Sequence, residues 1–344
     1  MSDRLASDRA LVVGGCGLLG RALVRSLRAD GRPVRVLDLQ PFAGDAVESL
    51  VGDLRDPDVA TRACAGVATV FQTAALVDWS PAAHAAVHAV NVLGNRRVLQ
   101  AARAAGVRRF VYTSSMDVVF DGAPIVDGDE SLPYPARHLD PYSTSKMLAE
   151  REVLEADDPR GMRTAAVRPT GIYGPGDRRR FDPLVAMARR GAIWTMGDMR
   201  ARLSHVYVDN CAHLHRVVEA HLEGAARAAG RVYFAADEAA NFITFQRPLL
   251  DSLGLRYRVR RLPAALARAL GRGGELLWRL PGPHRRHKPL LTRYTVAVIL
   301  SDLCFQDARA RRELGYAPPV TRADAHARTL AWYRRTYGGA DADA

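Results

Sequence analysis

Short apolar runs alternate with longer amphipathic stretches through the first half of the chain. The apolar runs are rich in β-branched residues and predict strands at residues 10–15, 33–39, 68–75, 108–115 and 163–171. Helical patterns lie between them, notably at residues 18–31, 81–105 and 141–156. Strands that are apolar on both faces need helices on both sides, so the alternation predicts a doubly wound α/β fold on a parallel sheet.

The alternation becomes less regular after residue 175. Helical patterns appear at residues 183–191, 307–315 and 321–335, and strand patterns at residues 203–210 and 230–237. We therefore expect a first unit at residues 1–175 and a smaller, less regular part at residues 176–338, with some segments returning to the main sheet. The polar stretch 339–344 predicts a flexible tail.

Charge and cysteine content exclude some classes of protein. The chain carries 49 Lys and Arg against 37 Asp and Glu, a net charge of +12, which invites a nucleic-acid or acidic-membrane reading. The arginines are spread along the chain, with short clusters only at residues 177–181 and 284–288, so we expect no nucleic-acid partner. The four cysteines are far apart and lack metal-ligand spacing, which predicts reduced thiols, no metal and a cytoplasmic location.

No apolar run reaches the length of a signal peptide or a membrane span, so we expect no membrane span. One stretch, residues 262–288, leaves surface association open because it places Leu266, Leu270, Leu277 and Trp278 near a basic cluster. The alternative is a core-facing helix followed by a Pro/Gly loop, and we favour it because three glycines between 271 and 274 interrupt the helical face.

A glycine-rich loop follows the first predicted strand and opens the first helix. In "GGCGLLG", Gly14 permits the tight turn, Gly17 lets the backbone approach a pyrophosphate, and Gly20 allows close packing of helix on sheet. The helix N-terminus then faces the phosphates. We expect this loop to bind a dinucleotide through Gly14, Gly15, Cys16, Gly17, Leu18, Leu19 and Gly20.

Two carboxylates follow later strands. Asp38 ends the second strand, where a carboxylate accepts hydrogen bonds from the adenosine ribose and repels a 2′-phosphate. Leu39 and Gln40 follow it, so no cation stands there to bind that phosphate, and we expect NAD rather than NADP. Asp53 is ambiguous, because it either meets the adenine amino group or caps the next helix.

The stretch "DPYSTSK" (140–146) places a phenol and an ammonium one helical turn apart. Asp140 predicts an N-cap and Pro141 a first helical residue, so Tyr142 and Lys146 share one helical face. A nearby cation lowers the pKa of a phenol, and a compact ammonium also donates to ribose hydroxyls. Only two lysines occur in this arginine-rich chain, so Lys146 is predicted to be functional and Tyr142 to be the catalytic base.

Two further residues are candidates for the same site. Ser115 ends a strand at the carboxyl edge of the sheet and is expected to orient the substrate oxygen, although its neighbour Ser114 stays open as an alternative. Asn91 lies inside a predicted helix, where its side chain could open the backbone and hold a water in contact with Lys146.

Together these motifs resemble the extended short-chain dehydrogenases/reductases, which have a Rossmann-like fold. The resemblance covers nearly the whole chain and rests on "GGCGLLG", "GDLRD", "TAA", "YTSS", "YSTSK" and "RPTGIYGPGD". It implies that Ser115, Tyr142, Lys146 and Asn91 form a catalytic tetrad. It also implies that the cofactor contacts Asp38, Asp53, Leu54, Thr73, Ala74, Ala75, Tyr142, Lys146, Pro169, Gly171 and Ile172. Two residues depart from the family pattern: Val13 stands where threonine is frequent, and Gln72 where histidine is frequent.

Within that family, "TSSMDVVFDG" followed by "DPYSTSKMLAE" is similar to the 3β-hydroxysteroid and sterol-4-carboxylate dehydrogenase branch. Gly171 stands where nucleotide-sugar enzymes usually carry asparagine. The branch implies NAD-dependent oxidation of a 3β-hydroxyl on a steroid or sterol-like substrate, with decarboxylation of a 4-carboxysterol as an open extension. The alternatives are a reductase of bulky 3-keto acids, a nucleotide-sugar epimerase or dehydratase, and a non-enzymatic cofactor sensor.

The same resemblance implies separate roles for the two parts of the chain. Residues 1–175 are expected to bind NAD and supply catalysis, and residues 176–338 to bind substrate. Substrate contacts are predicted at Met116, Tyr173 and Trp194, with further apolar lining from Val118, Phe120 and Met196. The family also implies a homodimer formed through paired helices.

Overall fold

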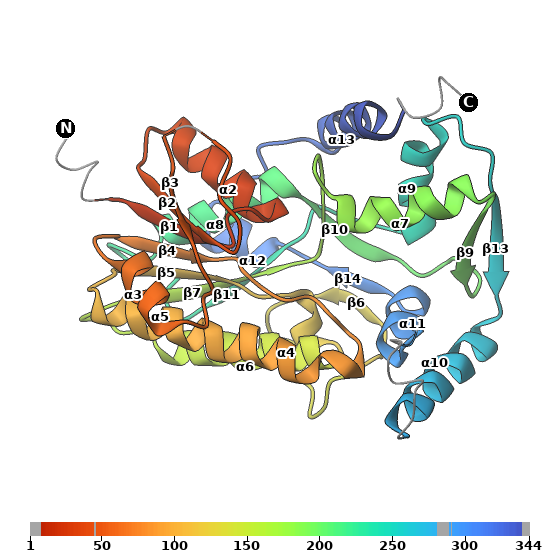
Figure 1. Cartoon of the computed structure of the whole chain (residues 1–344), viewed down its shortest axis with the longest axis horizontal. Coiled ribbons are helices and arrows are strands. Elements are labelled where there is room, and N and C mark those ends of the chain that lie inside the picture. Colours follow the sequence, from red (N-terminus) through yellow and green to blue (C-terminus); the bar gives the residue numbers. More distant parts are fainter. Residues whose placement is uncertain (1–7, 45, 281–288, 290, 339–344) are drawn as a thin grey trace.

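A computed structural model gives the fold and describes residues 8–44, 46–280, 289 and 291–338. The tail 339–344 and the basic cluster 284–288 lie outside these residues. The main sheet has seven parallel strands in the order β11-β7-β5-β4-β1-β2-β3 (Figure 1). These strands are β1 Ala10–Val13, β2 Val34–Asp38, β3 Glu48–Val51, β4 Thr69–Gln72, β5 Arg109–Thr113, β7 Arg163–Pro169 and β11 Val232–Ala235. The predicted doubly wound parallel sheet is confirmed.

Helices cover both faces of this sheet because its strands are apolar on both sides. Ala10 and Val12 of β1 face one hydrophobic core, and Leu11 and Val13 face the other. The first core is closed by α2 Leu18–Ala29, α8 Val208–Ala220 and α12 Ala308–Leu314. The second is closed by α3 Pro57–Cys64, α5 Asn95–Ala104 and α6 Pro141–Glu155. Between α4 His84–His88 and α5, residues Ala89–Gly94 form a π-helical segment.

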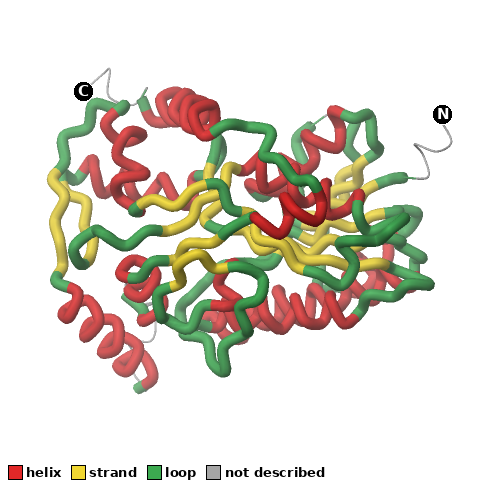
Figure 2. Tube along the Cα trace, turned by 180° about the vertical axis from the view of Figure 1, so that it is seen from behind, coloured by secondary structure: helices red, strands yellow, loops and turns green. Residues whose placement is uncertain are grey.

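The chain after residue 175 contributes to both parts of the molecule. β11 pairs with β7 and α8 packs on α2, so segments do return to the main sheet, as predicted. The other strands form a five-stranded sheet of β6 Ile125–Gly128, β8 Gly171–Tyr173, β10 Leu203–Tyr207, β12 Glu238–Ala240 and β14 Leu303–Phe305, and a pair of β9 Ala192–Met196 with β13 Arg258–Leu262 (Figure 2). The remaining helices are α7 Arg178–Arg189, α9 Phe242–Asp251, α10 Ala264–Arg279, α11 Arg293–Leu300 and α13 Arg322–Tyr337.

The helix α10 corrects the interpretation of residues 262–288. It is continuous through the three glycines, and Gly271 packs so closely on the Thr292 carbonyl that an added Cβ would lie 3.2 Å from it. Leu266, Leu270 and Leu277 are about half exposed, so they do not face a core, and surface association of this helix stays a prediction. Among the described residues, no helix has the length and hydropathy needed to cross a membrane.

Candidate active site

The first turn of α6 holds the predicted base. The Asp140 carboxylate caps the helix by accepting a 2.9 Å hydrogen bond from the Ser143 amide, and Pro141 is the first helical residue, as predicted. Tyr142 and Lys146 are both buried and share the face of α6 that points to the sheet. The Lys146 ammonium donates to the carbonyl of Thr113, the last residue of β5. The helix cap and the end of β5 thus place these two groups together at the carboxyl edge of the sheet.

Ser115 joins this pair, whereas Ser114 does not. Ser115 precedes the short turn Met116–Val119, and its hydroxyl donates a 2.7 Å hydrogen bond to the Asp117 carboxylate. Burial raises the pKa of the Tyr142 phenol, and the nearby Ser115 hydroxyl partly opposes this rise. The buried Ser114 hydroxyl has no hydrogen-bond partner among the described residues. The structure therefore favours Ser115 of the two candidates.

The protein groups alone do not ionise the phenol. Burial raises the pKa of Tyr142 well above its usual value, and the nearby Asp117 carboxylate raises it further. Burial also lowers the pKa of Lys146 to about 7, an effect that Glu150 opposes. In the protein by itself, burial is the largest influence on the Tyr142 pKa. The Lys146 ammonium donates to the Thr113 carbonyl, and its effect on the phenol beside a bound dinucleotide stays a prediction.

Asn91 lies in the π-helical segment, which agrees with the expectation of a locally opened backbone. Its amide binds Leu76 twice, accepting from the backbone N–H at 2.8 Å and donating to the carbonyl at 2.9 Å. It also donates to the Ser145 hydroxyl at 3.0 Å, and Ser145 donates to the Tyr142 carbonyl. Asn91 therefore ties the loop after β4 to the first turn of α6, and its role in a water relay stays a prediction.

The glycine loop has the shape that a dinucleotide requires. Gly14 has a φ of +81°, and a Cβ there would lie 2.7 Å from the Ala74 backbone. A Cβ on Gly20 would lie 2.2 Å from the Gly14 carbonyl oxygen, so only glycine lets α2 start this close to the loop. No side chain caps α2 at Gly17, which leaves its first backbone N–H groups available to phosphate oxygens. These residues fit a dinucleotide cofactor.

Asp38 lies at the end of β2, beside this loop. Its carboxylate accepts a 2.9 Å hydrogen bond from the Cys16 amide and a 3.4 Å bond from the Gln40 amide. Asp53 is not the cap of α3, because Asp56 accepts from the Asp58 and Val59 amides instead. That alternative for Asp53 is wrong, and its carboxylate is paired with Arg55, which lowers its pKa.

The remaining cofactor candidates follow the ends of the central strands. Thr73, directly after β4, donates from its hydroxyl to the Val13 carbonyl at 2.8 Å and so joins the glycine loop to the neighbouring strand. The Ala74 amide donates to the side chain of Gln72. Ala75 follows β4 and Pro169 ends β7, whereas Gly171 and Ile172 lie in β8 of the five-stranded sheet. Leu54 packs against Gly94 of the π-helical segment. Contact of these residues with a cofactor stays a prediction.

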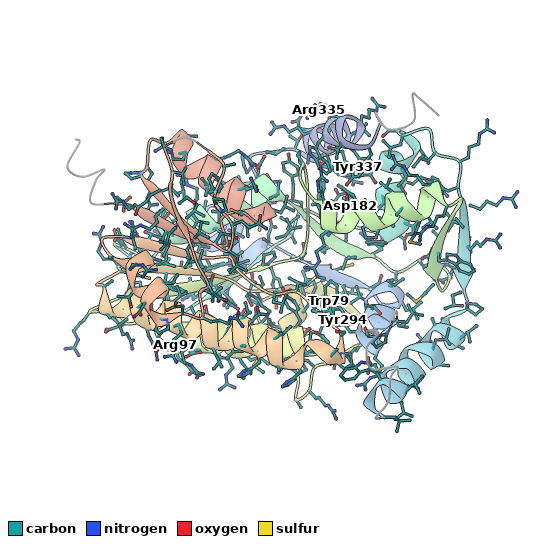
Figure 3. The ribbon with its side chains drawn as sticks, viewed as in Figure 1. Trp79, Arg97, Asp182, Tyr294, Arg335 and Tyr337 are labelled. Carbon is teal, nitrogen blue, oxygen red and sulfur yellow. The ribbon has the colours of Figure 1, made fainter. Side chains whose placement is uncertain are left out.

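Two aromatic residues, Trp79 and Tyr294, lie beside the Tyr142 ring or the Ser115 turn, and the sequence did not predict them. Trp79 and Tyr294 lie side by side (Figure 3) and stack with 5.3 Å between their ring centroids. The Trp79 ring meets the Tyr142 ring edge-on at 6.2 Å. The Tyr294 hydroxyl donates to Asp117 at 2.7 Å, and the Arg179 guanidinium lies 5.2 Å from the Trp79 ring. Trp79 lies in the loop after β4, and loops that follow strands often carry binding residues, whereas Tyr294 comes from α11, far along the chain.

Only one of the three predicted substrate residues lies in this cluster. Met116 is buried in the same apolar core as Tyr294. Tyr173 is buried elsewhere and packs edge-on against Phe245 at 4.9 Å. Trp194 is 59% exposed on β9, with Arg260 over its ring. Tyr173 and Trp194 thus lie outside the cluster around Tyr142, and their contact with a substrate stays a prediction. The predicted lining residues Val118, Phe120 and Met196 are also buried in cores.

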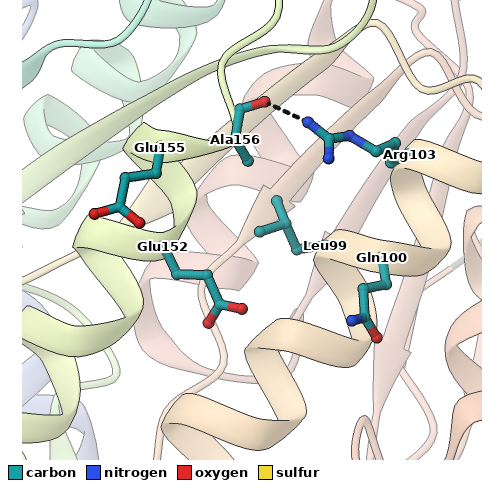
Figure 4. A pocket seen from close by; sticks show the side chains of 6 residues that line it. All are labelled: Leu99, Gln100, Arg103, Glu152, Glu155 and Ala156. Atoms are coloured by element: carbon teal, nitrogen blue, oxygen red, sulfur yellow. Dashed lines mark hydrogen bonds between the residues drawn. The ribbon is translucent and has the colours of Figure 1, made fainter.

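A separate groove lies between α5 and α6, at the end of α6 opposite Tyr142. It is lined by Leu99, Gln100, Arg103, Glu152, Glu155 and Ala156, and Arg103 donates to the Ala156 carbonyl (Figure 4). Its charged lining and its distance along α6 separate it from the Ser115–Tyr142 cluster. Within the described part of the chain, no group of His, Cys, Asp or Glu side chains is arranged to hold a metal ion.

Comparisons with known proteins agree with this geometry. The model of the 3-beta hydroxysteroid dehydrogenase/isomerase family matches residues 11–264. A Mycobacterium tuberculosis protein named 3 beta-hydroxysteroid dehydrogenase/Delta 5-->4-isomerase is 38% identical, over 94% of this chain and 90% of its own length. The Mus musculus sterol-4-alpha-carboxylate 3-dehydrogenase, decarboxylating, is 32% identical, over 96% and 92%. The Streptomyces venezuelae dTDP-glucose 4,6-dehydratase DesIV, solved with NAD bound, has a TM-score of 0.73 at 26% identity, over 96% and 98%.

Proposed function

The chain belongs to the 3-beta hydroxysteroid dehydrogenase/isomerase family, and from that premise we propose that it oxidises the 3β-hydroxyl of a steroid or sterol-like substrate with NAD. It is an oxidoreductase of that family. The observation that carries the proposal is that Ser115 and Tyr142 lie in one cluster with the stacked rings of Trp79 and Tyr294. The Trp79 ring meets Tyr142 edge-on, and the Ser115 and Tyr294 hydroxyls both donate to Asp117. A flat apolar ring system fits such a wall, and its hydroxyl then meets two polar groups.

Each residue of the cluster has a separate role in alcohol oxidation. Bound NAD supplies a positively charged ring whose C4 accepts the hydride. Tyr142 takes the proton from the substrate hydroxyl while Ser115 holds the oxygen in place. Lys146 and Asn91 keep α6 and the adjoining loop in register, Lys146 through the Thr113 carbonyl and Asn91 through Ser145. Reversed, the same groups reduce a ketone.

The preference for NAD over NADP is supported by Asp38. Its carboxylate is fixed by the Cys16 amide at the edge of the glycine loop, where it would bind ribose hydroxyls and repel a 2′-phosphate. The solved DesIV structure has NAD bound. A homodimer through paired helices stays a prediction.

The finer identity of the substrate has two candidates within the family, because the relatives include both steroid dehydrogenase/isomerases and decarboxylating sterol dehydrogenases. A nucleotide-sugar substrate is disfavoured at Gly171. An added Cβ there would lie 3.0 Å from the Arg180 guanidinium and 3.1 Å from the His205 ring, so an asparagine would have to displace these two side chains. A reductase of bulky 3-keto acids is the remaining alternative.

The test is turnover of three substrate panels. NADH absorbance follows 3β-hydroxysteroids and 4-carboxysterols, product analysis follows nucleotide sugars, whose epimerisation or dehydration leaves no net NADH, and NADPH consumption follows bulky 3-keto acids. We expect turnover with the first panel only. Turnover confined to nucleotide sugars or to keto acids would overturn the proposal.

A further inference from the structure

Asp117 is a buried carboxyl in the candidate site that alcohol oxidation does not use. Only 5% of the residue is exposed, and burial raises its pKa. Burying a carboxylate costs folding free energy, and this one also raises the pKa of Tyr142, the group that must take the proton during alcohol oxidation. Because Asp117 opposes alcohol oxidation in this way, its presence is better explained by a role in a second reaction.

The position of Asp117 is defined by two hydrogen bonds. Its Oδ2 accepts from the Ser115 hydroxyl at 2.7 Å, and its Oδ1 accepts from the Tyr294 hydroxyl at 2.7 Å. Ser115 is also the group that holds the substrate C3 oxygen in the proposed function. With a substrate oxygen held by Ser115, the Asp117 carboxylate bonded to the same hydroxyl would lie within reach of the carbons next to C3, one of which is C4.

We propose that Asp117 is the acid–base residue that moves a proton at C4 of the 3-keto product, an inference that rests on the proposed function. When C3 is a ketone, breaking the C4–H bond places negative charge on the C3 oxygen. The Ser115 and Tyr142 hydroxyls, which face that oxygen, donate hydrogen bonds to it. A carboxylate base combined with a phenol at the enolate oxygen is an established arrangement for this proton transfer.

Isomerisation of a 3-oxo-Δ5-steroid removes one proton and returns one proton, and Asp117 can carry both transfers. Asp117 takes the C4 proton, and the electrons of that bond form the C3–C4 double bond of a dienolate. The protonated Asp117 then delivers the proton to C6, the C3 carbonyl reforms and the double bond moves to C4–C5. For a 4-carboxy-3-keto substrate, the C4–carboxylate bond breaks, carbon dioxide leaves and the electrons of that bond form a C3–C4 enolate. Asp117, protonated by water, then supplies the proton to C4.

A purely structural role is the competing explanation, because Asp117 also joins the Ser115 turn to α11 through Tyr294. Two variants separate the roles. Asp117→Asn keeps size and polarity but removes the base, whereas Tyr294→Phe removes one hydrogen bond of the same carboxyl and keeps the base. Thermal melting of both variants reports their folding.

The experiment supplies a 3-oxo-Δ5-steroid directly and follows formation of the conjugated enone, beside NADH formation from a saturated 3β-hydroxysteroid. A general base contributes about 100-fold or more, so we expect Asp117→Asn to lose at least that factor in isomerisation and clearly less in oxidation. Tyr294→Phe should reduce both activities by similar factors. Equal losses of both activities in Asp117→Asn, or an isomerisation rate close to that of the wild type, would overturn the inference.

Exchange of solvent deuterium keeps the inference testable if Asp117→Asn does not fold. In D2O, the wild-type protein should catalyse deuterium incorporation at C4 of a saturated 3-ketosteroid, measured by mass spectrometry. A wild type that oxidises the alcohol but neither isomerises nor exchanges refutes the role of Asp117 and leaves the proposed function standing. Absence of alcohol oxidation refutes the proposed function itself.

Discussion

The buried ion pair behind Lys146 offers a quantitative test of how α6 is held. Glu150 is fully buried, one turn after Lys146, and accepts from Arg168 through Nε at 3.0 Å and Nη2 at 2.6 Å. The Tyr134 hydroxyl donates to the same carboxylate. The variant Glu150→Gln removes the negative charge and leaves a guanidinium that is 3% exposed without a counterion.

Removing one partner of a buried pair costs about 3–5 kcal/mol, and a glutamine that keeps one acceptor oxygen places Glu150→Gln at about 3 kcal/mol. Urea denaturation should show this as a lower midpoint with an unchanged slope. The control is Glu150→Leu combined with Arg168→Met, which removes both charges and should recover most of the loss. A Glu150→Gln protein within about 1 kcal/mol of wild type would refute the reasoning, because a buried unpaired charge cannot be that inexpensive.

Two further predictions concern the cofactor loop and the helix cap. Asp38→Ala should lose about 10- to 100-fold in NAD affinity and tolerate NADP better, because it removes charge-assisted bonds to the ribose; fluorescence titration with NADH and NADPH checks this, and a wild type that already prefers NADP contradicts it. Burial raises the pKa of Asp140 from 3.8 to about 7, so the folded state holds a proton that the unfolded state lacks between those values, and the stability this confers is lost as the pH rises through that window. Asp140→Asn keeps the cap and should remove this pH dependence; denaturation midpoints measured from pH 4 to 8 that change in parallel for both proteins would count against it.

Local signals predicted the fold and the centre of the site. The cap, proline and four-residue spacing of "DPYSTSK" act within one helix, so Tyr142 and Lys146 were found together on one face. The glycine loop and the alternation of strands and helices are local in the same sense. The cap of α3 carried the same Asp-Pro signal at Asp56 and Pro57, which could have resolved the ambiguity over Asp53.

Features that depend on long-range packing were not accessible from the sequence. Asp117 and Tyr294 are 177 residues apart and meet only because α11 packs beside the turn after β5. The glycines of α10 predicted a break in the helix, but the helix is continuous. Gly271 instead allows α10 to pack closely on the Thr292 carbonyl. Burial, which spacing does not reveal, opposes charge on both Tyr142 and Lys146.

The most direct test of the account is NADH formation by wild type and Tyr142→Phe with one 3β-hydroxysteroid, together with NADH binding to both proteins. The account predicts turnover by wild type, a loss of about 100-fold or more in the variant, and nearly equal binding, because only the hydroxyl that takes the proton is removed. Substantial residual turnover in Tyr142→Phe would contradict the assignment of the base, and with it the central claim.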